Sequence, residues 1–168
     1  MPNLKIIPSA VAFALIALPS VARAQGAVGL WRHDELTRRD AALSTRIGQD
    51  GSARETLADY GNHRFRYLRR DSDGRPEQHN NIVDVVIVHS GQGTLLVGGE
   101  MVNPTGNADT GEYLGTAITG GTRHDLGPGD VIHIPEGLPH SFLVPQGQHL
   151  TYVLVKFPAP EGGTSRLP

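Results

Sequence analysis

The chain has 168 residues, a formal net charge of −2 and no cysteine. A slightly acidic chain gives no reason to expect nucleic acid or an anionic membrane surface as a partner. The absence of cysteine excludes iron–sulfur clusters, thiolate zinc sites and cysteine nucleophiles, so any bound metal must take nitrogen and oxygen ligands.

Residues 1–24 have the pattern of a secretory signal peptide. Lys5 gives a positive start, an apolar stretch runs from Ile6 to Val21, and small residues precede the predicted cleavage point after Ala24. The alternative is a transmembrane anchor, but the stretch is short for a membrane span and contains two prolines. We therefore expect a periplasmic or secreted mature protein that is not attached to a membrane after cleavage.

Residues 25–55 are expected to form an N-terminal helical arm. Between Leu30 and Ile47 the apolar residues Leu36, Leu43 and Ile47 recur on one helical face. This pattern predicts either an arm that packs on the rest of the protein, and that would also suit a dimer contact, or a solvated helix without a functional role.

From residue 56 to residue 160 the sequence changes to short β-rich runs separated by turn residues. Glycine becomes frequent and helical periodicity disappears, which favours an antiparallel barrel or sandwich. Residues 103–112 are predicted to be a long polar loop, either a slack insertion or a lid, and residues 161–168 a C-terminal tail. The predicted strands are Arg64–Arg70, Ile82–His89, Gly93–Val97, Leu114–Ile118, Thr122–Leu126, Asp130–Ile134, His140–Val144 and Thr151–Phe157.

A first group of polar residues lies near the start of the predicted strands. Glu77 and His79 are two residues apart, so they share one face of an extended chain. Asp84 follows in the otherwise apolar run Ile82–Val88. A buried carboxylate needs a strong partner, so Asp84 must either face solvent or meet a cation such as a divalent ion or an arginine.

A second group lies about fifty residues further along the chain. Gly129 opens a turn into a strand, and Pro135 and Gly137 end that strand and reverse the chain. His140 then begins the next strand, where its ring can point to one chosen face. Together the two groups predict one metal site assembled from two β-hairpins.

The second group resembles the second motif of the cupin superfamily, which reads G-x5-P-x-G-x2-H-x3-N. Gly129, Pro135, Gly137 and His140 match this motif, and only the final asparagine differs, because Val144 stands in its place. This spacing of three backbone-restricting residues and one histidine is specific to few folds.

The first group resembles the first cupin motif, G-x5-H-x-H-x4-E-x6-G, less completely. His79 matches the second histidine and Gly91 the closing glycine, whereas Glu77 replaces the first histidine and Asp84 replaces the glutamate. The opening glycine is displaced. The resemblance as a whole covers residues 64–157.

The resemblance implies an all-β, cupin-type jelly-roll barrel with a short N-terminal helix, one divalent metal ion near its centre, and a homodimer. The implied metal ligands are Glu77, His79, Asp84 and His140. Two carboxylates favour Mn²⁺ or Fe²⁺ over Cu²⁺, and Zn²⁺ is also compatible. In a second interpretation, His79, Asp84 and His140 form a two-histidine-one-carboxylate set, and Glu77 acts as a general base.

The resemblance further implies a small metal-dependent enzyme that acts on an oxygenated small organic molecule, either as a dioxygenase or as a non-redox lyase or isomerase. The alternative is a non-catalytic module that binds a small ligand or a metal. Candidate substrate-binding residues are His133, which alternates with apolar neighbours in its strand, Tyr152 in the last long strand, and Arg123 as a carboxylate clamp.

Overall fold

The computed structural model describes residues 28–160, which form one helix, α1 (His33–Ser44), and thirteen strands. The predicted signal peptide and the predicted C-terminal tail lie outside these residues. The described part contains no helix of the length and apolarity that a membrane crossing requires. The strands are β1 (Ser52–Asp59), β2 (Arg64–Arg70), β3 (Glu77–His79), β4 (Ile82–Gly91), β5 (Gly93–Val97), β6 (Glu100–Val102), β7 (Thr105–Asn107), β8 (Glu112–Leu114), β9 (Ala117–Thr119), β10 (Thr122–Leu126), β11 (Val131–Ile134), β12 (His140–Leu143) and β13 (Leu150–Pro158).

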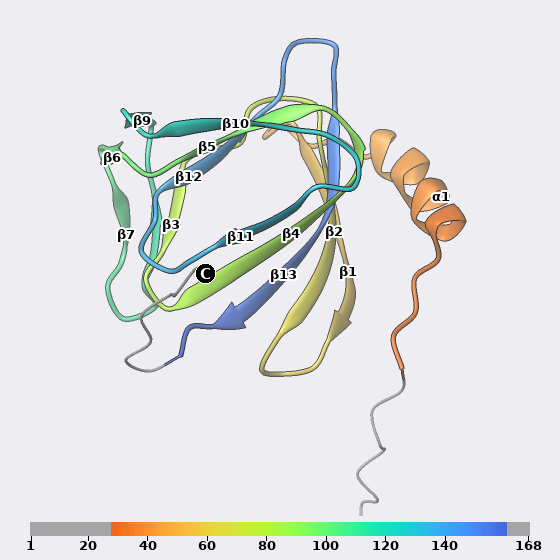
Figure 1. Ribbon diagram of the computed structural model, residues 1–168, viewed down its shortest axis with the longest axis horizontal. Coiled ribbons are helices and arrows are strands. Elements are labelled where there is room, and N and C mark those ends of the chain that lie inside the picture. Colours follow the sequence, from red (N-terminus) through yellow and green to blue (C-terminus); the bar gives the residue numbers. More distant parts are fainter. Residues whose placement is uncertain (1–27, 161–168) are drawn as a thin grey trace, which may run out of the picture.

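Two antiparallel sheets face each other across the interior of the molecule (Figure 1). One sheet has the order β1-β2-β13-β4-β11 and the other has the order β10-β5-β12-β3-β8-β7. Strands β6 and β9 form a separate two-stranded ribbon. The predicted all-β jelly-roll class is confirmed. The barrel is not closed, however, because within residues 28–160 no strand pairs with both large sheets.

Most predicted strands agree with the structure to within two residues at each end. The prediction of a single strand over Leu114–Ile118 is wrong, because the chain leaves one sheet at Gly115 and enters the ribbon at Thr116. The Gly115 N–H donates to the Pro76 carbonyl, and the Thr116 N–H donates to the Val102 carbonyl. The predicted polar loop contains β7, which pairs with β8 as a short hairpin.

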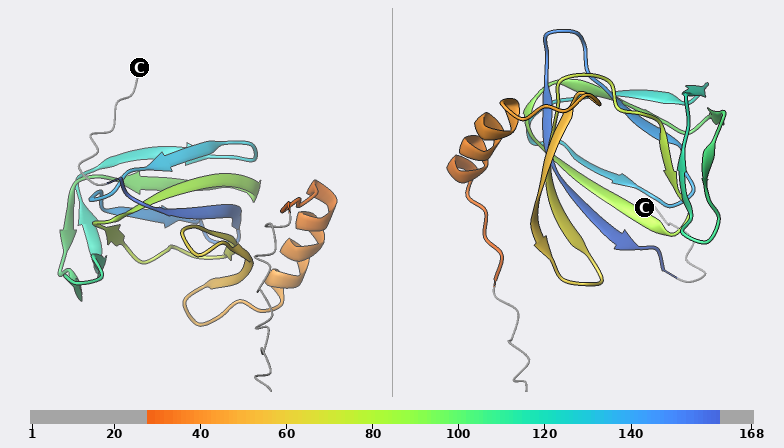
Figure 2. Two further views of the ribbon diagram at one scale, coloured as in Figure 1. Left: turned by 90° about the horizontal axis from the view of Figure 1, so that it is seen from below. Right: turned by 180° about the vertical axis from the view of Figure 1, so that it is seen from behind.

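Helix α1 is shorter than predicted and packs on the outer face of the first sheet, beside β1 and β2 (Figures 1 and 2). Leu43 is buried together with Tyr67, and Leu36 and Ile47 pack around them. The helix is therefore a packing element of its own chain. Strand β1 begins at Ser52, within the range 25–55 expected to form the arm.

A buried carboxylate fixes the helix to the sheet. Asp40 accepts hydrogen bonds from Arg69 Nη1 at 2.9 Å, Ser90 Oγ at 2.6 Å and Thr151 Oγ1 at 2.8 Å. Burial alone would raise the pKa of Asp40, but these three donors lower it overall. The carboxylate thus stays charged in a site that α1, β2, β4 and β13 build together.

The interior between the sheets is apolar at one end and polar at the other. Val86, Val88 and Tyr152 belong to the apolar core, together with Phe142 from the facing sheet. Side chains on one face of a strand recur every second residue, so each strand has an inner row of side chains. Toward the polar end, these inner rows contain charged residues. The row of β4 continues to Asp84. The row of β13 continues through Leu154 to Lys156, and that of β2 from Leu68 to Arg66 and Arg64.

Candidate metal centre

Three strands deliver the predicted ligands to the polar end of the interior. Strand β3 carries Glu77 and His79 on its inner face, and β12 places His140 directly beside Glu77 in the sheet. Strand β4 of the facing sheet carries Asp84. The turn between β11 and β12 also contacts this region, because the Gly137 N–H donates to the His79 carbonyl at 2.7 Å.

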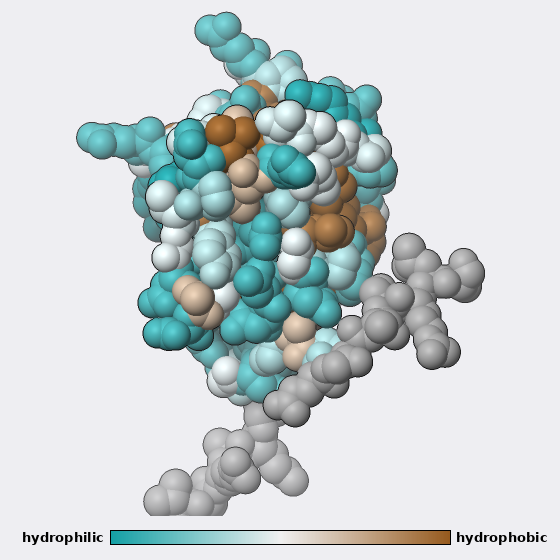
Figure 3. Space-filling model, turned by 90° about the vertical axis from the view of Figure 1, so that its left-hand side faces the viewer, coloured by the Kyte–Doolittle hydropathy of each residue, from teal (hydrophilic) through white to brown (hydrophobic). Residues whose placement is uncertain are grey.

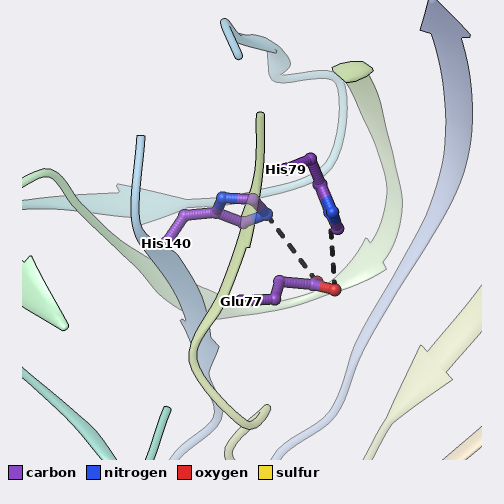
Figure 4. Close-up of side chains that lie close together, drawn as sticks. All are labelled: Glu77, His79 and His140. Carbon is purple, nitrogen blue, oxygen red and sulfur yellow. Dashed lines mark ion pairs between the residues drawn. The ribbon is translucent and has the colours of Figure 1, made fainter. Parts of the chain in front are cut away.

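Glu77, His79 and His140 converge (Figure 4). His79 Nε2 lies 3.6 Å from Glu77 Oε2, and His140 Nε2 lies 3.7 Å from Glu77 Oε1. One donor atom from each of the three residues lies within 4.8 Å of the other two. A tetrahedral ion with bonds of about 2.1 Å holds its donors about 3.4 Å apart, so the spacing fits a metal ion.

The orientation of both imidazoles also fits metal binding. His79 Nδ1 is 2.6 Å from Glu112 Oε2, and His140 Nδ1 is 3.0 Å from the Leu138 carbonyl. Because each Nδ1–H has an acceptor, each Nε2 presents its lone pair to the interior. His140 is almost fully buried, and its Nε2 has no hydrogen-bond partner. A buried nitrogen without a hydrogen-bond partner is unfavourable, and a bound cation would satisfy it.

Asp84 approaches the same atoms from the facing sheet but has a cation of its own. Its Oδ2 lies 3.5 Å from His79 Nε2 and 3.7 Å from His140 Nε2. Both carboxylate oxygens lie 3.0 Å from Lys156 Nζ. Burial would raise the pKa of Asp84, but the two histidines and Lys156 hold it well below its ordinary range. Glu77, in contrast, forms no ion pair with a lysine or arginine among residues 28–160, so the donor group whose carboxylate has no such partner contains Glu77 rather than Asp84.

Sequence reasoning missed two residues of this site, Lys156 and Glu112. The sequence does indicate that Lys156 is unusual. It shares a strand face with Tyr152 and Leu154, and the sequence contains only one other lysine, Lys5. Glu112 lay at the end of the predicted polar loop, and nothing in the sequence pattern placed it beside a histidine.

The three candidate substrate-binding residues do not join this cluster. Tyr152 lies in the apolar core, where its ring stacks on Phe142 with centroids 4.9 Å apart and its hydroxyl accepts a hydrogen bond from Arg70. Burial raises the pKa of Tyr152. His133 and Arg123 are both exposed, on outward-facing positions of β11 and β10.

Two cavities lie beside the cluster, between β2 and the β3–β8 edge. The smaller has a volume of about 230 Å³, and its lining includes Arg64, Arg66, Glu112 and Lys156. The larger has a volume of about 740 Å³, and its lining includes Arg54, Arg70, Arg75 and Glu77. Only the larger cavity is lined by a proposed metal donor, so small molecules can approach Glu77 through an opening whose walls carry several arginines.

Comparisons with protein-family models and with curated proteins find no match. Among solved structures, TT1209 from Thermus thermophilus covers 79% of this chain and 100% of its own, at 15% identity and a TM-score of 0.53. KdgF from Halomonas sp. covers 68% of this chain and 86% of its own, at 17% identity and a TM-score of 0.47. A cupin 2 conserved barrel domain protein from Rhodopseudomonas palustris covers 70% of this chain and 66% of its own, at 26% identity and a TM-score of 0.46.

The likeness to TT1209 is one of fold. The residues of the second motif lie around one strand and one turn, because Gly129, Pro135 and Gly137 bracket β11 and the turn that leads to His140. The donors that converge come from both motifs and lie between two jelly-roll sheets. The chain thus has the all-β, cupin-type jelly-roll fold that its sequence motifs predict.

Proposed function

We propose that this protein is a metal-dependent enzyme that acts on a small oxygenated organic acid by proton transfer, as a non-redox lyase or isomerase. The observation that carries this proposal is the convergence of Glu77 and the two imidazole Nε2 atoms, one of which is buried without a partner. Glu77, His79 and His140 would hold one divalent ion: manganese, iron or zinc. Such an ion, when bound, polarises a hydroxyl, carbonyl or carboxylate oxygen of the substrate.

Proton transfer is supported by the charged groups around these donors. Glu77 is partly exposed and lines the larger cavity, so its carboxylate is accessible to a bound molecule. Lys156 lines the smaller cavity and can donate a proton or a hydrogen bond there. Both groups lie beside His79 Nε2, so a carboxylate and an ammonium flank the proposed metal site and are suited to remove a proton and return it.

The arginines of β2 support an anionic substrate. Arg64, Arg66 and Arg70 occupy inner-face positions that apolar residues usually fill in a jelly roll. Arg64 pairs with Asp59, and Arg70 donates to the Tyr152 hydroxyl. Within residues 28–160 Arg66 forms no ion pair, and it lines the cavity that also contains Lys156. A free guanidinium binds a carboxylate through two parallel hydrogen bonds, so Arg66 is suited to hold the acid group of a substrate.

A metal and substrate screen tests the proposed reaction. The protein, loaded in turn with manganese, iron and zinc, is incubated with small hydroxy and keto acids with and without oxygen. We expect turnover that does not require oxygen. Turnover that depends on iron and oxygen would favour a dioxygenase, which the two-histidine-one-carboxylate group also suits. Tight binding of an acid without turnover would favour the non-catalytic module.

A separate experiment tests the substrate class. Lactate and propane-1,2-diol share one carbon skeleton, and only lactate carries a carboxylate. Titration monitored by NMR should show that Arg66→Gln weakens lactate binding by roughly tenfold and leaves diol binding unchanged, because one charge-assisted hydrogen bond is lost. Arg123→Gln removes an exposed outer-face arginine and serves as the control. Equal lactate affinity in both variants would exclude Arg66 as the anion-binding residue.

A further inference from the structure

Lys156 places its ammonium group among the metal donors. Its Nζ lies 2.7 Å from His79 Nε2 and 3.0 Å from each oxygen of Asp84. Strand β13 holds this position because Lys156 lies opposite Asp84 in the register of β4 and opposite Arg64 in that of β2. The ammonium is thus a cation in direct contact with one of the three proposed metal ligands.

One atom cannot serve both cations. The His79 ring donates its Nδ1 proton to Glu112, so Nε2 has a single lone pair, and that lone pair accepts the hydrogen bond from Lys156. A metal ion bound by Glu77, His79 and His140 needs the same lone pair. We infer that Lys156 occupies the cation position of the metal-free protein, and that a divalent ion binds only by displacing the ammonium from His79. This inference rests on the proposed metal site.

The surroundings allow this exchange. Lys156 lines the cavity of about 230 Å³, so its side chain has space to turn away from His79. Glu112 lines the same cavity, and its side chain is half exposed, so a second carboxylate lies within the space that the lysine can enter. Lys156 can therefore leave His79 without losing a negatively charged partner.

The use of lysine at this position supports the same inference. Apart from Lys5, Lys156 is the only lysine in the sequence, and every other cationic side chain in residues 28–160, histidines aside, is an arginine. An ammonium is a compact point charge on a flexible stem, so it can take the place of a spherical ion and then move. The planar guanidinium of arginine suits neither role.

Zinc affinity in matched variants tests the competition. Isothermal titration of the full chain with Zn²⁺ compares Asp84→Asn with the double variant Asp84→Asn/Lys156→Met, so that no unpaired Asp84 charge is created. We expect the double variant to bind zinc about ten- to hundredfold more tightly, because the metal no longer displaces a hydrogen bond to a charged group. Equal or weaker affinity would overturn the inference.

Chemical labelling of Lys156 in the wild-type chain gives a second readout. Reductive methylation followed by peptide mass spectrometry should show faster modification of Lys156 when zinc is saturating. His140 is a proposed metal donor that makes no contact with Lys156. In the variant His140→Ala, zinc should therefore leave the rate of Lys156 methylation unchanged. If zinc binds the wild type but leaves Lys156 labelling unchanged or slower, the exchange is wrong and the metal site stands. If zinc binds neither the wild type nor the variants, the proposed function fails with it.

Discussion

The imidazoles of His79 and His140 point to the same place, but different groups orient them. His140 is oriented by a backbone carbonyl two residues away, whereas His79 depends on the side chain of Glu112 from β8. The support of His79 is therefore the one that a single substitution can remove without altering a metal ligand. Carboxylates in this role fix the tautomer and the direction of the ligating imidazole.

We predict that Glu112→Gln weakens metal binding by about 10–100-fold, because the amide orients His79 less firmly and makes Nε2 less basic. Metal titration of the purified protein measures this effect. Glu100→Gln, which changes an exposed glutamate on β6, should leave the affinity unchanged. An unaltered affinity in Glu112→Gln would show that the 2.6 Å contact with His79 has no role in metal binding.

We predict that Glu77→Gln lowers metal affinity and abolishes turnover, because Glu77 is the carboxylate of the converging donor group. Metal content after dialysis and single-turnover assays measure the two effects separately. Loss of turnover with full metal content would instead identify Glu77 as a general base alone. If metal content and turnover both survive, Glu77 has neither role.

The sequence predicts the position of a site residue where that position depends on a single strand or a single turn. The two-residue spacing of Glu77 and His79 fixes a shared face, and the turn at Pro135 and Gly137 leads to His140. Contacts between separate sheets leave no such pattern, so the pairing of Lys156 with Asp84 was not predicted. Asp84 was expected either to face solvent or to meet a cation such as a divalent ion or an arginine. It is buried, and the cation in contact with it is a lysine.

At the scale of secondary-structure elements, the cupin motif glycines are explained by backbone conformation and close packing. Gly91 ends β4 with φ +79°, and a Cβ there would lie 1.9 Å from the His149 carbonyl oxygen. Gly137 has φ +78° in the β11–β12 turn, and a Cβ there would meet nothing within 4 Å. The two positions thus share one conformational requirement, and only Gly91 also faces a steric one.

We predict that Gly137→Ala costs about 1–2 kcal/mol of the free energy of unfolding, the penalty of an alanine in the left-handed region. Gly91→Ala should cost more than this, because the backbone of His149 must also move. Urea denaturation of both variants measures the difference. Equal losses would show that the turn relaxes around Gly91 without a steric penalty.

Helix α1 depends on the charge of Asp40. We predict that Asp40→Asn lowers the free energy of unfolding by about 1.5–3 kcal/mol at pH 7, because hydrogen bonds to a charged acceptor are weakened. The native pKa of Asp40 is lowered, so its contribution is complete above the ordinary aspartate pKa of about 3.9 and is lost as pH falls through the native value.

Urea denaturation at pH 7 and at pH 3 measures this contribution. The deficit of the variant should shrink at the lower pH. Asp34→Asn is the control, because Asp34 is an exposed helix residue paired only with Arg38, and it should change stability by well under 1 kcal/mol. A deficit in Asp40→Asn that is independent of pH would contradict the electrostatic account.

Strand predictions succeeded where alternation is long and failed where the chain changes sheets. Strands β2, β4 and β13 are long, and each has a regular inner and outer row. Leu114–Ile118 is equally apolar and β-prone in sequence, yet Gly115 and Thr116 carry the chain between two sheets. Strand β3 has only three residues and depends on β12 and β8 for its hydrogen bonds, so its sequence alone does not indicate it.

At the scale of the whole molecule, the open side of the jelly roll gives the polar end its access to solvent. The two cavities beside the cluster, the larger of which is lined by Glu77, lie where β2 and the β3–β8 edge are not hydrogen-bonded to each other. The face that Figure 3 shows is mostly hydrophilic, with apolar residues in separate patches.

The predicted export and homodimer remain proposals, and the exposed pair Ile87 and Val131 offers apolar surface for a second copy.

Metal binding by the whole protein tests the central claim most directly. Elemental analysis and thermal unfolding, each after addition of manganese, iron or zinc, should show one divalent ion per chain and a higher melting temperature. An excess of 100 times Kd stabilises a folded protein by about 2.7 kcal/mol. His140→Ala should lose both effects, whereas His133→Ala, which removes an exposed histidine of β11, should keep both. No bound ion in the wild type, or full binding by His140→Ala, would contradict the account.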